Sequence, residues 1–539
     1  MTGVQTCALP ILNPKLTLLL GVRYDVFTPF TEAHGRISNY DFPDALSNPA
    51  AALSSALKIP GVNGVSATAD IPTEYNNVAP RIGFAYRASP TIVFRGGYGL
   101  SFFPGNYTSN GDLKNAPFTS SYGPACQSNL AVQIETAQNG GVLPAGQNPA
   151  CLVAPFGTFA AGIPVPAAPS AAQIANLSTI PGLTFVSEAP NFKPGLVQQF
   201  NLQVEQQFGA NVFIIGYVGN IGQHLPESIN NINQPLPYNP ITNPNGKFRP
   251  LDTVFGNGNP ANSNLAGVSY LASEGISNYN SMQTSFQRRF AKGLAFDVNY
   301  VWGKALSDTS SYSQQGDQGW SNALPTNIRA TEYGISELDI QNRFSISLNY
   351  EFQFGKEFTG AKKAFLGGWQ VNTISAWQTG KPFTVDQSGT GVDNPIESDG
   401  IAHGFSNRAV PQNSGGNDRP DTIADPRLPG SQQSVNHFIN VAAFAPQPLG
   451  TIGNTPRNSL YGPHFRHVDL SLFKDFPVTE RATLQFRAEG YNISNTPSFF
   501  IGNNNTSNQE FGNPAFGTIS ATDPNYTPRQ IQFALKVQF

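Results

Sequence analysis

Segments in which apolar and polar residues alternate run through most of this 539-residue chain. The pattern is clearest at 282–302, where Met282, Phe286, Val298 and Trp302 alternate with serine, glutamine, aspartate and asparagine residues. Alternation with a period of two makes one face of an extended strand apolar and the other polar. Residues 291–293 interrupt the pattern as a short turn, so the sequence predicts a β-hairpin here.

The same alternation recurs along the chain and predicts about a dozen strands. The other segments that show it are 16–24, 82–86, 92–102, 200–204, 212–219, 344–352, 369–377, 484–489 and 531–539. The two strands of the 282–302 hairpin have about ten residues each, the length that crosses a bilayer when tilted. No apolar run approaches the ~18 residues of a membrane-spanning helix. The pattern favours an all-β fold, namely an antiparallel transmembrane β-barrel with long extracellular loops.

The connections between the expected strands fall into two groups. Turns of a few residues lie near 88, 210, 292 and 479, and they alternate with long segments rich in glycine, proline, asparagine and serine at about 103–195, 220–279, 304–341 and 379–465. Long structureless loops argue against an ordinary compact domain. Short turns at one end and long loops at the other are typical of outer-membrane barrels, whose turns are periplasmic and whose loops are extracellular.

The composition indicates little charged surface. Lysine, arginine, aspartate and glutamate make up 12% of the residues and give a net charge of −3, whereas about 25% is usual in soluble proteins. The 39 phenylalanines are compatible with β-strands, and the 52 glycines and 44 prolines with many turns. Nucleic-acid binding would need a basic surface, so no nucleic acid is expected as a partner.

The cost of placing charge in lipid decides which face of each strand points outward. An arginine or lysine costs about 2–4 kcal/mol at mid-membrane and about 0–1 kcal/mol near the interface. We therefore expect the polar face to line a lumen, and Arg288 to lie on the lipid face close to a turn. The residues expected in the lumen, as a hydrated wall that contacts a plug, are Arg95, Gln203, Glu205, Arg289, Asp297, Asn299, Arg343, Glu351, Arg487 and Glu489. The candidates for aromatic girdles at the membrane interfaces are Tyr24, Tyr98, Tyr300, Trp302, Trp369 and Trp377.

The two ends of the chain carry different signals. Residues 1–11 resemble the in-frame translation of a sequencing-library adapter, and they lack the basic start and sustained apolar core of a signal peptide. We therefore expect residues 1–11 not to be native, and residues 12–539 to be the C-terminal portion of a longer protein. The last strand ends at Phe539. A final amphipathic strand with a terminal aromatic residue resembles the signal that the barrel-assembly machinery recognises.

Nine short segments, taken in their order and spacing, carry a family pattern. They are 77–86 (NVAPRIGFAY), 94–99 (FRGGYG), 216–225 (GYVGNIGQHL), 277–283 (SNYNSMQ), 287–290 (QRRF), 366–370 (LGGWQ), 380–384 (GKPFT), 469–474 (DLSLFK) and 484–492 (LQFRAEGYN). The chain resembles, over nearly all of residues 12–539, the C-terminal barrel of TonB-dependent receptors of the Oar-like type. Receptors of this type carry a carboxypeptidase-regulatory-like domain ahead of the plug.

The resemblance implies a barrel of about 22 strands around a plugged lumen. It implies an outer-membrane receptor that binds a solute through extracellular loops and imports it when the TonB system remodels the plug. The regulatory-like domain, the plug, the TonB-contacting segment and the early strands are then missing here. The expected partners are outer-membrane lipid, the barrel-assembly machinery, the TonB system through the missing plug, and an unidentified solute. Because lipid cannot satisfy open sheet edges, we expect the isolated fragment to misassemble or aggregate.

Motifs for catalysis or cofactor binding are not found in the sequence. The histidines show no zinc-binding spacing, and there is no nucleophile elbow, phosphate loop or complete calcium loop. We expect no catalytic residue, no metal site and no cofactor, and a protein that is not an enzyme. Cys126 and Cys151 lie in the longest loop, on the predicted cell-surface side, where thiols can stay oxidised. They are candidates for a disulfide, with two free thiols as the alternative.

Two other kinds of protein stay open at this point. A secreted β-sandwich adhesin or carbohydrate-binding protein would bury its apolar faces against each other and would not need membrane-length strands. A secreted β-rich glycosidase would present a pair of acids in a cleft, and the sequence offers no such pair. The place of the apolar faces, against lipid or against each other, discriminates among these proteins.

Overall fold

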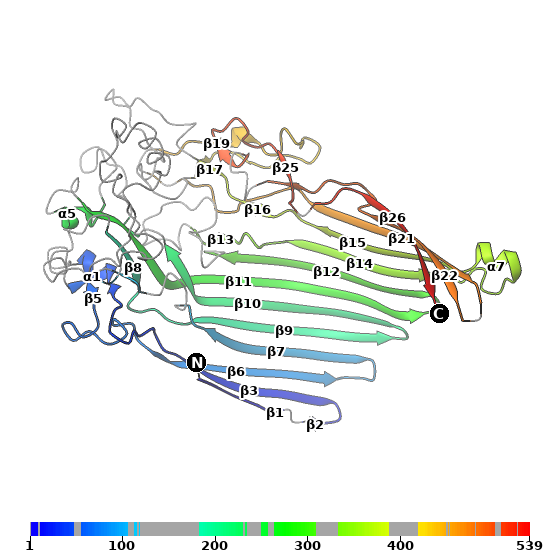
Figure 1. The fold of residues 1–539 in the computed structure, drawn as a ribbon, viewed down its shortest axis with the longest axis horizontal. Helices are drawn as coiled ribbons and strands as arrows, with labels where there is room; N and C mark the ends of the chain where they lie inside the picture. Colours follow the sequence, from blue (N-terminus) through cyan, green and yellow to red (C-terminus); the bar gives the residue numbers. More distant parts are fainter. Residues whose placement is uncertain are drawn as a thin grey trace, which may run out of the picture.

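A single large sheet of 16 strands dominates the structure, which is a computed structural model. Its strands run side by side along the length of the molecule (Figure 1). The structure describes residues 2–8, 11–47, 55–105, 113–115, 118, 183–229, 232–233, 249–256, 263–308, 332–387, 419–448, 451, 453–479, 481–501, 508–524 and 526–539.

Thirteen strands follow one another across this sheet in chain order, each antiparallel to its neighbours. They are β1 (Thr2–Ala8), β3 (Leu16–Phe27), β6 (Glu74–Arg87), β7 (Ile92–Phe103), β9 (Gly195–Phe208), β10 (Asn211–Ile229), β11 (Leu265–Ala291), β12 (Leu294–Ser307), β14 (Asn342–Glu351), β15 (Trp369–Gln378), β21 (Phe465–Pro477), β22 (Thr483–Tyr491) and β26 (Gln530–Gln538). The predicted antiparallel strands are confirmed, including the hairpin at 282–302, which is the β11–β12 pair.

Three more strands join this sheet beside the main path, and the remaining elements are short. β2 (Ile11–Asn13) pairs with β3, β8 (Leu183–Glu188) with β11, and β13 (Gly334–Ile335) with β12. Five two-stranded pairs join β4 (Asn39–Tyr40) to β5 (Leu57–Lys58), β16 (Pro382–Phe383) to β20 (Leu460–Tyr461), β17 (Asp386–Gln387) to β24 (Glu510–Phe511), β18 (Asp421–Thr422) to β19 (Phe444–Ala445), and β23 (Phe499–Phe500) to β25 (Ala521–Thr522). The described helices are α1 (Phe42–Ser47), α5 (Asp252–Phe255), α7 (Gly360–Leu366) and the 3₁₀ turn η5 (Val441–Ala443).

The strand register separates an apolar face from a polar face across the whole sheet. In β11 and β12, Phe286 lies opposite Val298, whereas Gln287 lies opposite Asp297. Because each pair of opposite residues shares a face, the alternation along one strand is repeated on the next. We refer to the side that carries Phe286 as the apolar face and to the other as the polar face.

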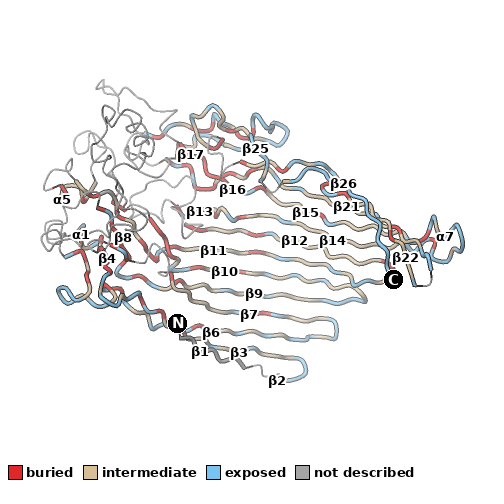
Figure 2. Tube along the Cα trace, viewed as in Figure 1, coloured by how far each residue is buried: buried red, intermediate tan, exposed pale blue. Residues whose placement is uncertain are grey.

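The apolar face is not covered by a second sheet in the part of the chain that the structure describes. Trp302 on β12 is 59% exposed, and Phe533 on β26 is 70% exposed. Figure 2 shows that buried residues gather at one end of the strands, whereas the strands themselves are intermediate or exposed along most of their length. The arrangement is a single-layer wall, and it is unlike the two packed sheets of a β-sandwich.

The sheet is open rather than closed. Its two outermost strands, β1 and β26, are not paired with each other, and every residue of β26 is exposed. One edge of β26 therefore presents backbone donors and acceptors that the described residues leave unpaired. In a membrane such an edge needs a further strand, because lipid supplies no hydrogen bonds.

Short and long connections lie at opposite ends of the sheet, as the sequence predicts, with one exception: the connection between β14 and β15, which contains α7, is long but lies at the turn end. The turns between β6 and β7, β9 and β10, and β11 and β12 lie at one end, and the remaining long connections gather at the other (Figure 1). The predicted loop at 220–279 is wrong in its limits, because β10 runs to Ile229 and β11 begins at Leu265. These two strands continue pairing far beyond the ten residues that the sequence suggested. Regular alternation fades there because side chains of these segments, such as Leu265, Val268 and Leu271, are buried in clusters with residues of the connections.

Two register shifts mark the point at which the β10–β11 hairpin leaves the regular wall. Gly222 lies opposite Ser277, but the next pair is Leu225 with Gly275, and the one after it is Glu227 with Ala272. Such β-bulges increase twist and bend a strand. Beyond them, β11 also pairs with β8 in parallel, at residues 265–271 of β11. This parallel pair is an exception to the predicted antiparallel arrangement.

The long connections are not structureless where they are described, which corrects the expectation of loops without a core. A first loop cluster joins six segments of the chain, and in it the ring of Tyr40 stacks on that of Phe185 at 4.2 Å. Its buried residues are Tyr40, Phe42, Ala45, Ala56, Leu57, Ile59, Leu183, Phe185, Ile229, Ile232, Leu251, Phe255, Leu265 and Val268. A second loop cluster contains Phe383, Val385, Phe438, Ile439, Ala443, Phe444, Leu460 and Ile501. Burial of these apolar side chains stabilises the loop end of the sheet.

Candidate functional site

The polar face of the sheet carries nine of the ten residues that the sequence places in the lumen. The strand registers put these nine on β7, β9, β12, β14 and β22. The tenth, Arg289, lies in the irregularity of β11 between Arg288 and Ala291, so the register does not assign it to a face. The grouping of the nine on one face follows from the strand register. Their contact with a lumen stays a prediction.

Several charged side chains of the polar face are paired with or hydrogen-bonded to neighbours. The guanidinium of Arg95 lies 3.5 Å from the carboxylate of Glu205 on the adjacent strand, with both groups partly exposed. Asn299 donates to the carboxylate of Asp297 at 2.6 Å. Because both charge signs occur along the face, it is suited to a hydrated wall that contacts other polar groups, rather than to one charged substrate.

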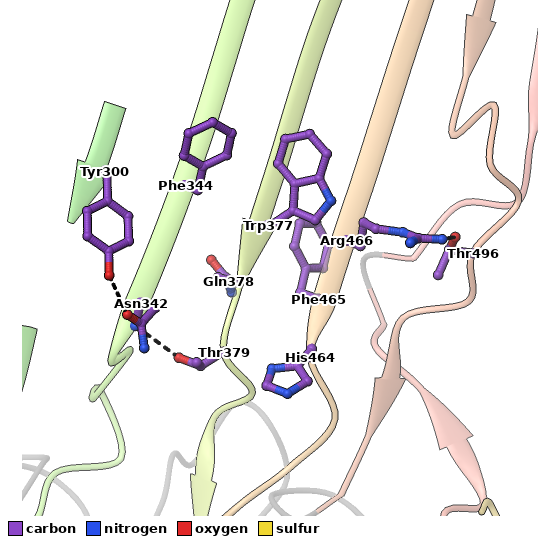
Figure 3. Close-up of a pocket in the computed structure, with 10 residues that line it drawn as sticks. All are labelled: Tyr300, Asn342, Phe344, Trp377, Gln378, Thr379, His464, Phe465, Arg466 and Thr496. Atoms are coloured by element: carbon purple, nitrogen blue, oxygen red, sulfur yellow. Dashed lines mark hydrogen bonds between the residues drawn. The ribbon is translucent and has the colours of Figure 1, made fainter. Parts of the chain in front are cut away.

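The apolar face carries all six girdle candidates. In Figure 3, Tyr300, Phe344, Trp377 and Arg466 lie in a row across β12, β14, β15 and β21, near the loop end of these strands. Each is the direct cross-strand neighbour of the next. The rings of Phe344 and Trp377 are 5.4 Å apart. The row ends with Arg466, whose guanidinium donates to the Thr496 hydroxyl at 2.9 Å.

This aromatic row lines a shallow pocket of about 560 Å³. The Tyr300 hydroxyl donates to the Asn342 side-chain oxygen at 2.7 Å, and the backbone nitrogen of Asn342 donates to the Thr379 hydroxyl at 3.2 Å. The pocket therefore has an apolar floor and a polar rim on the loop side. Tyrosine and tryptophan are enriched at membrane interfaces because they suit such a change from apolar to polar surroundings: one end of the side chain is apolar and the other can hydrogen-bond to water.

A second aromatic position lies at the turn end of the same face. Trp369 begins β15 and Trp377 lies eight residues later on the same side, a separation of about 26 Å along a strand. The apolar band of an outer-membrane barrel is about 25 Å tall. The amine of Lys474, opposite Trp369, lies over the rings of Trp369 and Phe476 at 5.5 and 4.7 Å. This lysine was missed by the sequence analysis.

The loop end is held by a group of polar side chains that we call the loop clamp: Lys304, Glu332, Asp339, Arg419, Arg457 and Tyr461. At its centre the Tyr461 hydroxyl donates to the buried carboxylate of Asp339 at 2.6 Å. The amine of Lys304 donates to the Tyr461 hydroxyl at 2.8 Å, and Gln341 donates to it at 2.9 Å. Burial, and next the hydrogen bond to Asp339, raise the pKa of Tyr461 far above its usual value.

Two buried arginines complete the loop clamp. The guanidinium of Arg419 donates to both carboxylate oxygens of Glu332, at 3.1 and 2.8 Å. That of Arg457 donates to the carbonyl oxygens of Ser307 and Asp308, the latter at 3.0 Å. The clamp thereby fastens the connection between β15 and β21 to the connection between β12 and β14. No sequence signal predicts these partners, because they are far apart in the chain.

Comparison with known protein families shows which class of β-sheet protein this chain belongs to. Residues 12–532 match the family model described as an outer membrane beta barrel domain. The chain belongs to this family of outer-membrane β-barrel domains. The barrel domain is therefore located in the cell outer membrane, and its strands form a transmembrane barrel wall.

Solved structures similar to the barrel domain are outer-membrane receptors and transporters. They include the outer membrane transporter YddB from Escherichia coli, with 10% identity and a TM-score of 0.42, covering 97% of this chain and 43% of that one. The ferripyoverdine receptor of Pseudomonas aeruginosa has 10% identity and a TM-score of 0.38, covering 99% and 38%. The FrpB iron transporter from Neisseria meningitidis has 10% identity and a TM-score of 0.39, covering 99% of this chain and 44% of that one. The chain spans less than half the length of each, and no curated protein matches it.

The remaining sequence predictions concern metals, helices and cysteines. Among the described residues, no group of three or more histidine, cysteine, aspartate or glutamate side chains could hold a metal ion. In the same residues, no helix has both the length and the apolar character needed to cross a membrane. Within the described ranges, the side chain of His467 contacts no metal-binding group of this kind; its Nε2 atom lies 2.8 Å from a carboxylate oxygen of Asp469. Cys126 and Cys151 lie outside the described residues.

Proposed function

We propose that the barrel domain is the C-terminal part of a TonB-dependent outer-membrane receptor of the Oar-like type, which imports a solute. The observation that carries this proposal is the open, single-layer wall with one polar and one apolar face. Narrow barrels fill their interior with their own side chains, whereas barrels of about 22 strands surround a separate plug. A wall of twelve strands from β3 to β26, with an unpaired edge, fits part of such a wide barrel.

We assign the apolar face to lipid. The spacing of Trp369 and Trp377 supports two girdles, one at the turn end and one at the loop end. The row of Tyr300, Phe344 and Trp377 forms part of the loop-end girdle. Tyr24, Tyr98 and Trp302 share its face. The polar face, with Arg95, Glu205 and the other lumen candidates, then contacts water and the plug.

We propose that the complete receptor also has early strands, a plug and a carboxypeptidase-regulatory-like domain. Residues 2–8, which lie outside the family match at 12–532, occupy the edge of β3 as β1. An open strand edge accepts any extended segment, because the pairing uses backbone groups alone. We infer that a native strand occupies this edge, and that Phe539 serves in recognition by the barrel-assembly machinery.

The long connections at the loop end would then contact the solute from the cell exterior. The loop clamp and the two loop clusters support this role, because they hold segments from several connections in fixed positions. A preorganised surface loses less entropy when it binds a ligand. Release into the lumen would follow rearrangement of the plug by the TonB system.

Uptake measurements test the proposal. Cells that express the full-length gene product are supplied with labelled iron chelates, oligosaccharides and peptides, with and without a functional TonB system. Import of one class that stops without TonB supports the proposal. A protein recovered as a soluble monomer without detergent, or import that does not depend on TonB, contradicts it. Deletion of the plug is the matched control. It leaves the barrel wall in place but removes the part that the TonB system would rearrange.

The alternative of a secreted β-sandwich adhesin is not favoured. A sandwich buries its apolar faces, whereas Trp302, Phe533 and Leu535 on the apolar face are all exposed. The apolar clusters of the structure lie at the loop end instead (Figure 2).

A further inference from the structure

Helix α7 projects from the turn end of the wall, between β14 and β15 (Figure 1). None of its seven residues is buried. Phe365 is 74% exposed and Leu366 is 46% exposed. A helix this short is marginal in water, because its formation needs a costly first turn and then stabilising contacts on one face. The exposed apolar residues indicate that a contact surface is absent from the isolated chain.

Two hydrogen bonds place the C-terminal end of α7 on the apolar side of the wall. The indole nitrogen of Trp369 donates to the carbonyl oxygen of Phe365 at 3.0 Å. The amine of Lys474 donates to the carbonyl oxygen of Gly367. Trp369 and Lys474 are cross-strand neighbours on the apolar face. Helix α7 therefore lies beside the membrane-facing surface, and not against the polar face where a plug would sit.

The charge of the segment is basic. Lys362 and Lys363 are exposed, and neither has an ion-pair partner among the described residues. Lys356 lies 3.7 Å from the carboxylate of Glu351, and Glu357 is the remaining acid between β14 and β15. Phe354 is exposed as well. Basic residues beside exposed aromatic and aliphatic residues are typical of a helix that lies in a membrane interface.

We propose that α7 docks on an anionic phospholipid surface at the turn end of the barrel. Phe365 and Leu366 enter the boundary between headgroups and acyl chains, and Lys362 and Lys363 contact lipid phosphates. Continuity with the apolar face favours lipid over a periplasmic domain, because the contacts of Trp369 and Lys474 hold α7 on that side. The proposal rests on the assignment of the apolar face to lipid and is independent of solute import.

Hydrogen exchange in vesicles tests the docking. The full-length protein is reconstituted with phosphatidylethanolamine and phosphatidylglycerol, or with phosphatidylcholine alone, and exchange is followed in residues 360–368. We expect exchange to be about 25-fold slower in the anionic vesicles, since each of the two lysines near an anionic surface contributes about fivefold in affinity. The double variant Lys362→Glu/Lys363→Glu should lose this protection, and so should Phe365→Ser/Leu366→Ser.

The controls separate this docking from the orientation of the wall. The turn at 478–482 should exchange equally in both vesicles. Brominated acyl chains should quench the tryptophans of the apolar face. Quenching together with equal exchange of 360–368 in the two lipids overturns the docking and leaves the lipid-facing assignment intact. Absence of quenching contradicts both. Protection that grows with protein density instead of lipid charge would assign α7 to contact with a second copy and also overturn the proposal.

Discussion

Arg419 and Glu332, 87 residues apart in the sequence, form a bidentate ion pair at the loop end of the barrel wall. The side chains are 2% and 0% exposed. Their attraction is largely offset by the cost of removing two charges from water. The pair therefore acts less as a source of net stability than as a constraint, because each charge can be buried only when the other is in place.

Removal of one partner of this pair should loosen the loop end. Arg419→Ala leaves the Glu332 carboxylate buried without its partner, a change that typically costs about 3–5 kcal/mol. We expect faster proteolysis and hydrogen exchange at residues 332–341 and 453–461, with the strands unaffected. Glu332→Leu combined with Arg419→Leu should recover most of the loss. Arg427→Ala, which breaks the exposed pair with Asp425, is the matched control and should change neither measurement. Equal sensitivity of the two single variants would contradict this role for the buried pair.

The hydrogen bond between Tyr461 and Asp339 should lose its stabilising effect at high pH. The folded pKa of Tyr461 is raised above the ordinary value near 10, first by burial and next by the bond to Asp339. Its stabilising contribution is therefore fully present below pH 10, and it is lost as the pH rises through the folded pKa. Comparison of ultraviolet titrations of the wild type and Tyr461→Phe should show that the missing tyrosine ionises later than ordinary tyrosines. The variant should lose about 1.5 kcal/mol of local stability. Ionisation of Tyr461 near pH 10 would oppose this account.

A new charge at either of two adjacent residues on β12 should have very different effects on the stability of the barrel. Val298 lies on the apolar face opposite Phe286, and Asn299 lies on the polar face opposite Ser285. Val298→Arg should destabilise the barrel in vesicles by about 2–4 kcal/mol, because the charge enters lipid. Asn299→Arg should have little effect. Denaturant unfolding of the full-length protein in vesicles measures both. The reverse order would mean that the polar face is the one in contact with lipid.

Gly96 should tolerate a side chain less well than its neighbour Gly97. A Cβ atom at Gly96 would lie 2.5 Å from the ring of Phe84, which covers the glycine from the adjacent strand. At Gly97 the nearest atom is 3.4 Å away. We expect Gly96→Ala to cost about 1–3 kcal/mol, the usual range for overpacking, and Gly97→Ala to be nearly neutral. Heat stability of the folded barrel, read from its mobility in gels before and after boiling, distinguishes them. Equal effects would show that Phe84 moves aside freely.

The wall could be predicted from the sequence because its rule is local. Alternate residues must be apolar in contact with lipid, so the partners of Phe286 and Val298 follow from the pattern and the short turn between them. The same rule grouped Arg95 with Asp297, and Trp369 with Trp377. Whether these faces meet water and lipid is the prediction that the vesicle experiments address.

The loop end could not be predicted because its contacts depend on the tertiary fold. Nothing in the sequence near Arg419 points to Glu332, and nothing near Tyr461 points to Asp339. The predicted loop at 220–279 was wrong because alternation stops where strands leave lipid, although pairing between β10 and β11 continues. Helix α7 was missed because seven residues are too few to show a helical period.

The paired bulges near Gly222 and Ser277 divide the β10–β11 hairpin into a part that must suit hydrocarbon and a part that need not. Mutations in the outer part escape the alternation rule, so this region can change in sequence while the inner ladder keeps its register. A hairpin from another receptor, joined at this junction, would exchange the exterior surface without requiring the barrel to fold anew.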